Sequence, residues 1–233
     1  VGVDFSLFGD RFSGALTYYE KKTDDLLQSV PISTTSGHSG QTANVGSIIN
    51  KGVEFEFDAQ VVKAGDFSFE LYGNVSENRD EVLRLAQDAA GNDINLDNSY
   101  YTTRVGYPQG QFYLRTWGGV DPADGRPYYI VGGDHRDGPV SEEVTYSLFS
   151  AEQTVQGLRL PPIQGGLGLR LKWKQLSLDG NLMFQTGHKV FERWAWYTMA
   201  SGLRSVRTFA GDSRLMDRWQ QPGDITDVPK MVY

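Results

Sequence analysis

The chain has 233 residues, a formal net charge of −7, no cysteine, and abundant aromatic residues and glycine (12 Phe, 12 Tyr, 5 Trp and 27 Gly). The absence of cysteine excludes a disulfide framework and a thiolate metal site, and the negative charge argues against a nucleic-acid partner. No stretch of about 18 apolar residues predicts a transmembrane helix, and no signal peptide is recognisable. Because the sequence opens directly on the strand-like "VGVDFSLFGD", we expect it to be a piece of a longer chain.

The first 76 residues predict two β-hairpins. Apolar and polar residues alternate over 3–7, and after a tight turn at "GDR" they alternate again over 12–19. The stretch "GVEFEFDAQV" then alternates without a miss, and after the turn "VKAGD" the alternation resumes over 67–76. One side of "GVEFEFDAQV" is therefore apolar through Val53, Phe55, Phe57, Ala59 and Val61, and the other side is polar.

A third hairpin is predicted over 167–173 and 176–184, with its turn near "KQ". All the arms have about 8–11 residues, the length that a tilted strand needs to cross a bilayer. The turns within hairpins are short, whereas the connections between them are long, roughly 24–49, 77–164 and everything after 187. Short turns on one side and long loops on the other are typical of an outer-membrane β-barrel with extracellular loops.

The two faces of these strands predict two different surroundings. The only helical candidate, Glu77–Ala89, is highly charged, so nothing in the sequence supplies a protein layer for the apolar face. We therefore expect lipid to contact that face, through Val53, Phe55, Phe57, Phe67, Phe69, Leu71, Leu167, Leu169, Leu171 and Trp173. The ionisable residues need water, so the lumen-facing set is Glu54, Glu56, Asp58, Glu70, Arg170, Lys172 and Asp179. Six strands are too few to close a barrel, so other chain must complete the wall.

Four stretches resemble a known family in sequence and in order. They are "NVGSIINKGVEFEF", "GYPQGQFYLRTWGGVDPADGRPYYI", "PPIQGGLGLRLKWKQLSLDGNLMFQTGHKVF" and "DRWQQPGDITDVPK". Together they resemble the C-terminal third of the SusC/RagA family, TonB-linked nutrient importers of the Bacteroidetes outer membrane. The resemblance covers most of the chain and weakens around 88–100 and 134–160.

The resemblance implies an all-β fold, an antiparallel transmembrane β-barrel of about 22 strands with a plugged lumen. It also implies import of oligosaccharides or oligopeptides, energy supplied through TonB, and a SusD-like surface lipoprotein as a lid. The chain, 1–233, then represents a partial C-terminal segment of the barrel without the plug domain. The resemblance implies no enzyme activity, and the residues indicate no cofactor, no metal and no nucleic-acid partner.

The long loops contain the candidate substrate contacts, because flat rings beside hydrogen-bonding groups are suited to stacking on sugars or peptide side chains. Substrate choice is expected in the less family-like stretches 92–104 and 134–160. A structural alternative applies to the rings of 106–130, which would form the core of a folded loop. The candidate contacts are Asn95, Asn98, Tyr100, Tyr101, Tyr107, Tyr113, Trp117 and Arg126.

Several smaller features have competing interpretations. Trp194, Trp196 and Tyr197 are expected in an aromatic girdle, in a loop core or in contact with the lid. "DPADG" indicates a turn rather than a calcium site, because the EF-hand spacing is not met. His38, His135 and His188 lack the spacing of a catalytic or metal motif, and Asp134 and Asp137 around His135 indicate a solvated turn rather than a metal site. The functional alternatives are a soluble carbohydrate-binding β-module and a SusC-like scaffold for a surface complex.

Overall fold

The computed structural model describes residues 1–32, 35, 37–38, 40–88, 90–132, 141–199 and 211–231. The chain divides into two compact units. Unit 1 comprises 1–98, 102–111 and 158–189, and unit 2 comprises 99–101, 112–157 and 190–233. Both units are built on antiparallel β-strands.

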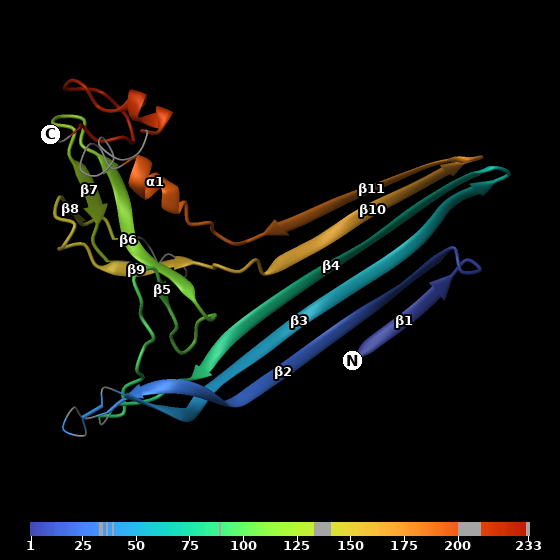
Figure 1. The fold of residues 1–233 in the computed structure, drawn as a ribbon, viewed down its shortest axis with the longest axis horizontal. Coiled ribbons are helices and arrows are strands. Elements are labelled where there is room, and N and C mark those ends of the chain that lie inside the picture. Colours follow the sequence, from blue (N-terminus) through green and yellow to red (C-terminus); the bar gives the residue numbers. More distant parts are fainter. Residues whose placement is uncertain are drawn as a thin grey trace. The chain divides into compact units, whose positions relative to one another are not determined.

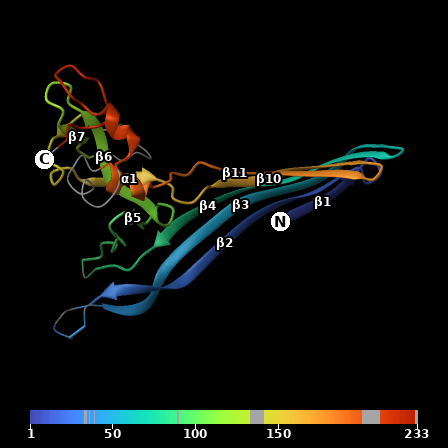
Figure 2. The ribbon, with the colours of Figure 1, turned by 45° about the horizontal axis from the view of Figure 1, so that its top comes forward.

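Unit 1 contains a long six-stranded antiparallel sheet with the strand order β1-β2-β3-β4-β10-β11 (Figures 1 and 2). The three predicted hairpins are confirmed as β1–β2, β3–β4 and β10–β11. The short turns of these three hairpins lie at one end of the sheet, which we call the turn end. We call the opposite end the loop end. The strands are β1 (Gly2–Leu7), β2 (Phe12–Pro31), β3 (Gly40–Ala64), β4 (Phe67–Arg84), β10 (Ile163–Trp173) and β11 (Leu176–Thr186).

The central strands are longer than the sequence predicts. β2, β3 and β4 have 20, 25 and 18 residues, against 11 each for β10 and β11. The prediction that 24–49 is a long connection is therefore wrong, because most of it is strand. The helix considered over Glu77–Ala89 is also wrong: 77–82 continues β4 and pairs in register with 48–53 of β3. The long-range ladder overrides the local helix propensity of this charged stretch.

Four register shifts interrupt this otherwise regular ladder. Three lie toward the loop end: those between Thr23 and Leu26 and between Leu26 and Leu27 in β2–β3, and that between Ser47 and Ile48 in β3–β4. The fourth, between Gln60 and Val62, leaves Val61 without a partner in β4 and sets Val62 opposite Phe69. The ladder therefore does not assign Val61 to either face, because a bulge adds one residue to one strand only, and its place on the apolar side stays a prediction.

The buried core of unit 1 lies toward the loop end of β3 and β4. Ile49, Val82, Leu85 and Ala86 are at most 9% exposed. The segment 102–111 continues the ladder there, because Val82 N donates to the Tyr107 carbonyl (2.9 Å) and Gly106 N to the Val82 carbonyl (2.9 Å). At this end, the segment 102–111 therefore pairs with the backbone of β4.

Unit 2 contains a smaller sheet with the order β5-β6-β7-β8, in which β9 also pairs with β6. Its buried core includes Phe112, Val120, Val155 and Val228. The elements are β5 (Tyr101–Thr102), β6 (Gln111–Val120), β7 (Pro127–Ile130), β8 (Val144–Thr145), β9 (Gln153–Gly157), the helix α1 (Arg193–Thr198) and the 3-10 helix η2 (Ser213–Asp217). Among the described residues, no helix combines the length and the apolar character needed to cross a membrane.

Candidate functional site

One face of the unit 1 sheet is apolar from strand to strand. Phe55 of β3 lies opposite Leu16 of β2 and Val75 of β4, and directly opposed residues of a ladder share a face. Across β4 and β10, Leu71 lies opposite Leu169. The ladders place all the predicted lipid-facing residues on this face: Val53, Phe55, Phe57, Phe67, Phe69, Leu71, Leu167, Leu169, Leu171 and Trp173.

Within the described part of unit 1, neither a helix nor a second sheet packs over the apolar face. Leu178 and Leu182 of β11 are 60% and 63% exposed, and Trp173 of β10 is 56% exposed. The rings of Phe5 and Phe55 stack only on their neighbours in the sheet, with centroids 6.5 Å apart. A contiguous apolar surface of this extent is unusual on a protein that faces water.

The opposite face is polar, and an arginine on it pairs with two carboxylates. Arg170 of β10 forms ion pairs with Glu70 of β4 (2.8 Å) and Asp179 of β11 (3.1 Å). The Tyr72 hydroxyl donates to Asn181 Oδ1 (2.8 Å). Most residues that line a hollow over the sheet belong to this face. The ladders place here all the predicted lumen-facing residues: Glu54, Glu56, Asp58, Glu70, Arg170, Lys172 and Asp179.

Glycines allow aromatic rings to lie flat on both faces. On the polar face, a Cβ added at Gly168 would lie 2.3 Å from Tyr72 Cζ. On the apolar face, a Cβ at Gly165 would lie 2.8 Å from Phe184 Cζ. Real Cβ atoms do not approach this closely, so each ring occupies the space that a larger residue would fill. Neighbouring rings thus explain two glycines of β10, Gly165 and Gly168.

The apolar face ends where charged residues begin, toward the loop end. Lys51 lies on the same face as Val53, two residues nearer the loop end of β3. It forms an ion pair with Glu20 of β2 (3.3 Å). In β4 the same row contains Glu77 and Arg79, paired at 2.7 Å. This row of charges limits the apolar part of β3 to the turn-end half of the strand.

The predicted substrate residues are divided between the two units. Asn95, Asn98 and Tyr107 belong to unit 1, whereas Tyr100, Tyr101, Tyr113, Trp117 and Arg126 belong to unit 2. Their role in substrate binding stays a prediction.

The rings of unit 2 pack mainly on one another. Tyr100 contacts Phe191 and Tyr101 contacts Phe112, with centroids 5.0 and 5.2 Å apart. Trp117 meets the edge of Tyr129 at 5.7 Å and remains 44% exposed. These contacts favour the interpretation that the rings form the core of a folded loop region.

The two motif segments "WGGVDPADGRP" and "RWQQPGDITDVPK" bind each other inside unit 2. Trp219 Nε1 donates to the Pro122 carbonyl (3.0 Å), and Gly223 N donates to the same oxygen (2.8 Å). Gly125 has φ +72°, and a Cβ there would lie 2.5 Å from the Trp219 ring. Trp219 therefore covers the turn at 122–125. The sequence analysis gave Trp219 no role of its own, and the only signal for this contact was a bulky ring in one motif and a glycine in the other.

The carboxylates of the turn "DPADG" are engaged by the turn itself. Asp121 accepts hydrogen bonds from Ala123 N (2.8 Å) and from the Tyr146 hydroxyl (2.6 Å), and the Tyr146 bond lowers its pKa most. Asp124 accepts from Arg126 N (3.0 Å), which lowers the pKa of Asp124, and the Arg126 guanidinium lies 4.5 Å above the Tyr146 ring. The described residues contain no group of three or more metal-ligating side chains, and His135, Asp134 and Asp137 lie outside them.

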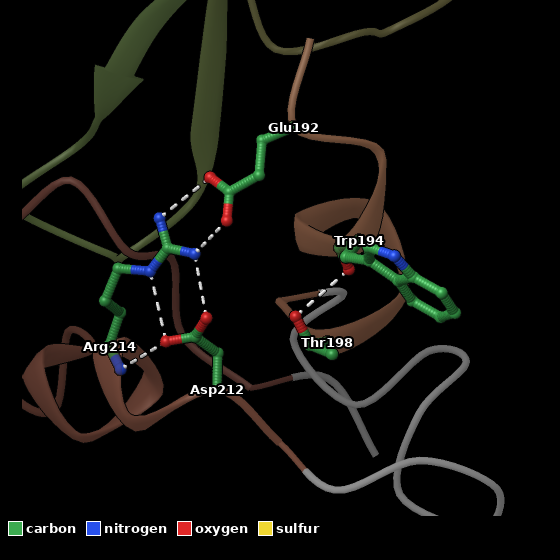
Figure 3. Close-up of polar contacts among 5 residues, drawn as sticks. All are labelled: Glu192, Trp194, Thr198, Asp212 and Arg214. Atoms are coloured by element: carbon green, nitrogen blue, oxygen red, sulfur yellow. Dashed lines mark hydrogen bonds and ion pairs between the residues drawn. The ribbon is translucent and has the colours of Figure 1, made fainter. Parts of the chain in front are cut away.

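An ion-pair cluster joins α1 to η2 (Figure 3). Arg214 Nη2 lies 2.8 Å from both Glu192 Oε1 and Asp212 Oδ2. The hydrogen bonds from Arg214 lower the pKa of Asp212 to about 2. Trp194, 69% exposed on α1, packs against Tyr197 with centroids 5.9 Å apart. The choice among an aromatic girdle, a loop core and contact with the lid stays open for these rings, and the Trp196 side chain lies outside the described residues.

Comparison with known proteins gives a consistent result. The family model for TonB dependent receptor-like, beta-barrel proteins matches residues 1–183. TonB-dependent receptor P39 of Formosa agariphila is 40% identical over 265 residues, covering 99% of this chain and 25% of the receptor. TonB-dependent receptor SusC of Bacteroides thetaiotaomicron is 34% identical over 123 residues, covering 48% of this chain and 12% of SusC. A structure of the RagAB peptide transporter is similar with a TM-score of 0.82 and 28% identity, covering 99% of this chain and 25% of that one. The chain spans about a quarter of the length of the curated relatives that it matches almost throughout.

Proposed function

Because the chain belongs to the family of TonB-dependent receptor-like β-barrels, we propose that it forms part of the wall of a SusC-like outer-membrane importer. In this proposal it is a C-terminal segment of the barrel, and the complete receptor also contains a plug domain. The apolar face of the unit 1 sheet contacts lipid and the polar face contacts the lumen. Unit 2 is then a folded extracellular loop region.

The uncovered apolar face is the observation that supports this proposal most directly. A soluble carbohydrate-binding module would have to hide Phe55, Leu169 and their neighbours, and no described element of unit 1 does so. The paired charges of Glu70, Arg170 and Asp179 suit a wet lumen, because a dry interior penalises ionised groups heavily. Lipid on one side and water on the other satisfies both faces.

The complete receptor, in this proposal, takes up oligosaccharides or oligopeptides with energy supplied through TonB and with a SusD-like lipoprotein as its lid. The similarity to the RagAB peptide transporter supports the peptide class. We propose no catalytic activity and no cofactor. The alternative of a scaffold for a surface complex shares the fold and differs only in the absence of transport.

Uptake by the native bacterium tests this function. Labelled oligosaccharides and labelled peptides are supplied to wild-type cells, to cells lacking the full-length receptor, and to cells lacking TonB. We expect uptake of one substrate class to fall to background in both mutants. Unchanged uptake of both classes in the receptor mutant, with the protein still present at the surface of wild-type cells, would favour the scaffold. A native full-length protein that is monodisperse without detergent would contradict the membrane assignment.

A further inference from the structure

The apolar face of the unit 1 sheet ends, at the turn end, with a tryptophan beside a lysine. Trp173 is the last residue of β10, and its partners Phe67 of β4 and Leu176 of β11 share this face. Trp173 and Leu176 are both more than half exposed. Lys174 begins the turn to β11, and its Nζ atom lies 5.6 Å from the centroid of the Trp173 ring, within the range of a cation–π contact. The ammonium group therefore lies at the border of the apolar face.

The backbone of Lys174 is fixed by the neighbouring turn. Its N atom donates to the carbonyl oxygen of Asp66 in the β3–β4 turn (3.0 Å). Lys174 has φ +53°, a conformation that glycine adopts more readily than any residue with a side chain. A residue kept in such a conformation points to a use for its side chain. The Asp66 carboxylate is not the partner, because no ion pair of the described residues joins it to Lys174.

The cations of the sheet differ in their partners between its two ends. Toward the loop end, ion pairs with carboxylates are formed by Lys22, Lys51, Arg79 and Arg84. The segments 8–11, 63–66 and 172–175 around the three turns contain four cations and only two carboxylates, Asp10 and Asp66. Within the described part of the chain, no ion pair includes any of these four cations, which are Arg11, Lys63, Lys172 and Lys174. The turn end therefore has an excess of positive charge, although the chain as a whole has a net charge of −7.

A cation at the border of an apolar surface is complementary to a molecule that has an anionic head and apolar chains. Lysine binds phosphate as a point charge, and each cation near an anionic lipid surface strengthens binding. A free phosphate ion would meet the ammonium group but would gain nothing from Phe67, Trp173 and Leu176. A zwitterionic lipid would bring its own cation close to Lys174, so an anionic phospholipid fits this border better.

We infer that Trp173 and Lys174 form a binding site for the phosphate headgroup of an anionic phospholipid in the leaflet at the turn end. This site rests on the function proposed above, in which the apolar face contacts lipid. The Lys174 ammonium group pairs with the phosphate, the Trp173 ring packs beside the headgroup, and the acyl chains lie along the apolar face. Lys63 and Lys172 both lie opposite Ser68 on the polar face and take no part.

The test uses the full-length receptor reconstituted into vesicles of phosphatidylglycerol and phosphatidylcholine in equal amounts. A photoreactive amino acid in place of Gln175, next to Lys174, cross-links the lipid that lies there, and mass spectrometry gives the ratio of the two lipids. The otherwise unchanged receptor should prefer phosphatidylglycerol. Lys174→Gln should lower this preference about fivefold, and the effect should fade as salt is raised. Trp173→Leu, which keeps the face apolar, should lower the preference by a smaller factor.

Lys63→Gln is the matched control, because it removes the same charge at the same end of the sheet but on the polar face. It should leave the preference unchanged, and a loss equal to that of Lys174→Gln would overturn the inference. Equal cross-linking of both lipids with Lys174 present would also overturn it. So would inorganic phosphate that abolishes the preference at constant ionic strength, since the lysine would then bind a free anion. No cross-linked lipid of either kind, with heat-modifiable mobility on gels showing an assembled barrel, would instead contradict the lipid contact in the proposed function.

Discussion

Both units are built on antiparallel strands, but the apolar side chains on these strands differ in how much of their surface is exposed. In unit 2, Phe112 and Val155 on paired strands are 4% and 5% exposed. In unit 1, Leu178 and Leu182 on an equally regular strand are 60% and 63% exposed. Alternation alone therefore specifies a two-faced strand, and the presence of a covering layer decides whether the apolar face meets protein. This contrast is what supports the proposal that the apolar face of the unit 1 sheet contacts lipid.

The largest effect is expected from a charge placed on the apolar face of unit 1, which tests whether this face differs in its surroundings from the buried side chains of unit 2. Phe55→Arg should cost about 2–4 kcal/mol if that face meets the hydrocarbon near the bilayer centre. Urea titration of the full-length receptor refolded into lipid vesicles measures this change. The assembled fraction in cell outer membranes should fall with it.

The matched control lies one residue away on the polar face. Glu54→Gln removes a charge without adding one to lipid, so assembly should be almost unchanged. Equal tolerance of Phe55→Arg and Glu54→Gln would mean that the two faces are assigned wrongly.

A substitution in unit 2 tests how much the packing of a ring inside this unit contributes to its stability. Gly125→Ala should cost about 1–3 kcal/mol, because Gly125 has a positive φ (+72°) and its added methyl group meets the Trp219 ring. Limited proteolysis should show faster cleavage within unit 2, while barrel assembly is retained. Gly223→Ala is the control, since Gly223 also has a positive φ (+98°) but has nothing within 4 Å of an added Cβ. Equal effects of the two substitutions would show that the Trp219 contact contributes nothing.

Substitutions of two glycines in β10 test the ring contacts on the polar face of the unit 1 sheet. Gly168→Ala should displace the Tyr72 ring and break its hydrogen bond to Asn181, at a cost of about 1 kcal/mol. Gly166→Ala should be nearly neutral, because its Cβ would meet its nearest atom, the Leu182 carbonyl oxygen, at 3.4 Å. Urea titration in vesicles measures both changes. If Gly166→Ala costs as much as Gly168→Ala, backbone freedom rather than the ring explains the glycines.

The smallest expected effect concerns the exposed ion-pair cluster of unit 2. The pKa of Asp212 is about 2 in the folded chain, below the usual value near 3.9. Its contribution to stability is therefore complete above about pH 4 and is lost as pH falls through about 2. Asp212→Asn should speed hydrogen exchange in peptides covering 211–218 at pH 5, measured by mass spectrometry against wild type at the same pH. The difference should shrink toward pH 2, and a constant difference would exclude the carboxylate as its source.

Much of the unit 1 sheet was predictable from the sequence, because its strands alternate strictly. The alternation over Val53–Ala59 and Leu167–Trp173 predicted correctly which side chains share a face of the sheet. The short turns predicted correctly which strands form hairpins. The outer part of β4 was not predictable in the same way, since 77–84 is charged and its strand conformation depends on pairing with β3, far away in sequence. The bulge at Val61 leaves no composition signal.

Unit 2 was the larger omission. Its strands β7, β8 and β9 have only 4, 2 and 5 residues, too short for a periodic signal. The aromatic residues of the motif around Trp117 indicated either substrate contacts or a loop core, and only their contacts with Tyr129 and with other rings favour the second. The docking of Trp219 on Gly125 depends on two segments about 90 residues apart, which no local pattern connects.

The register shifts near the loop end have a consequence for how such a sheet can change in length. Adding two residues to an outer strand keeps every later side chain on its original face, whereas adding one would reverse them all. A bulge absorbs the odd residue locally, and the shifts at Thr23/Leu26, Leu26/Leu27 and Ser47/Ile48 lie beyond the last apolar pair, Tyr18 and Val53. Insertions on that side of the pair can therefore be accommodated without disturbing the apolar half of the sheet.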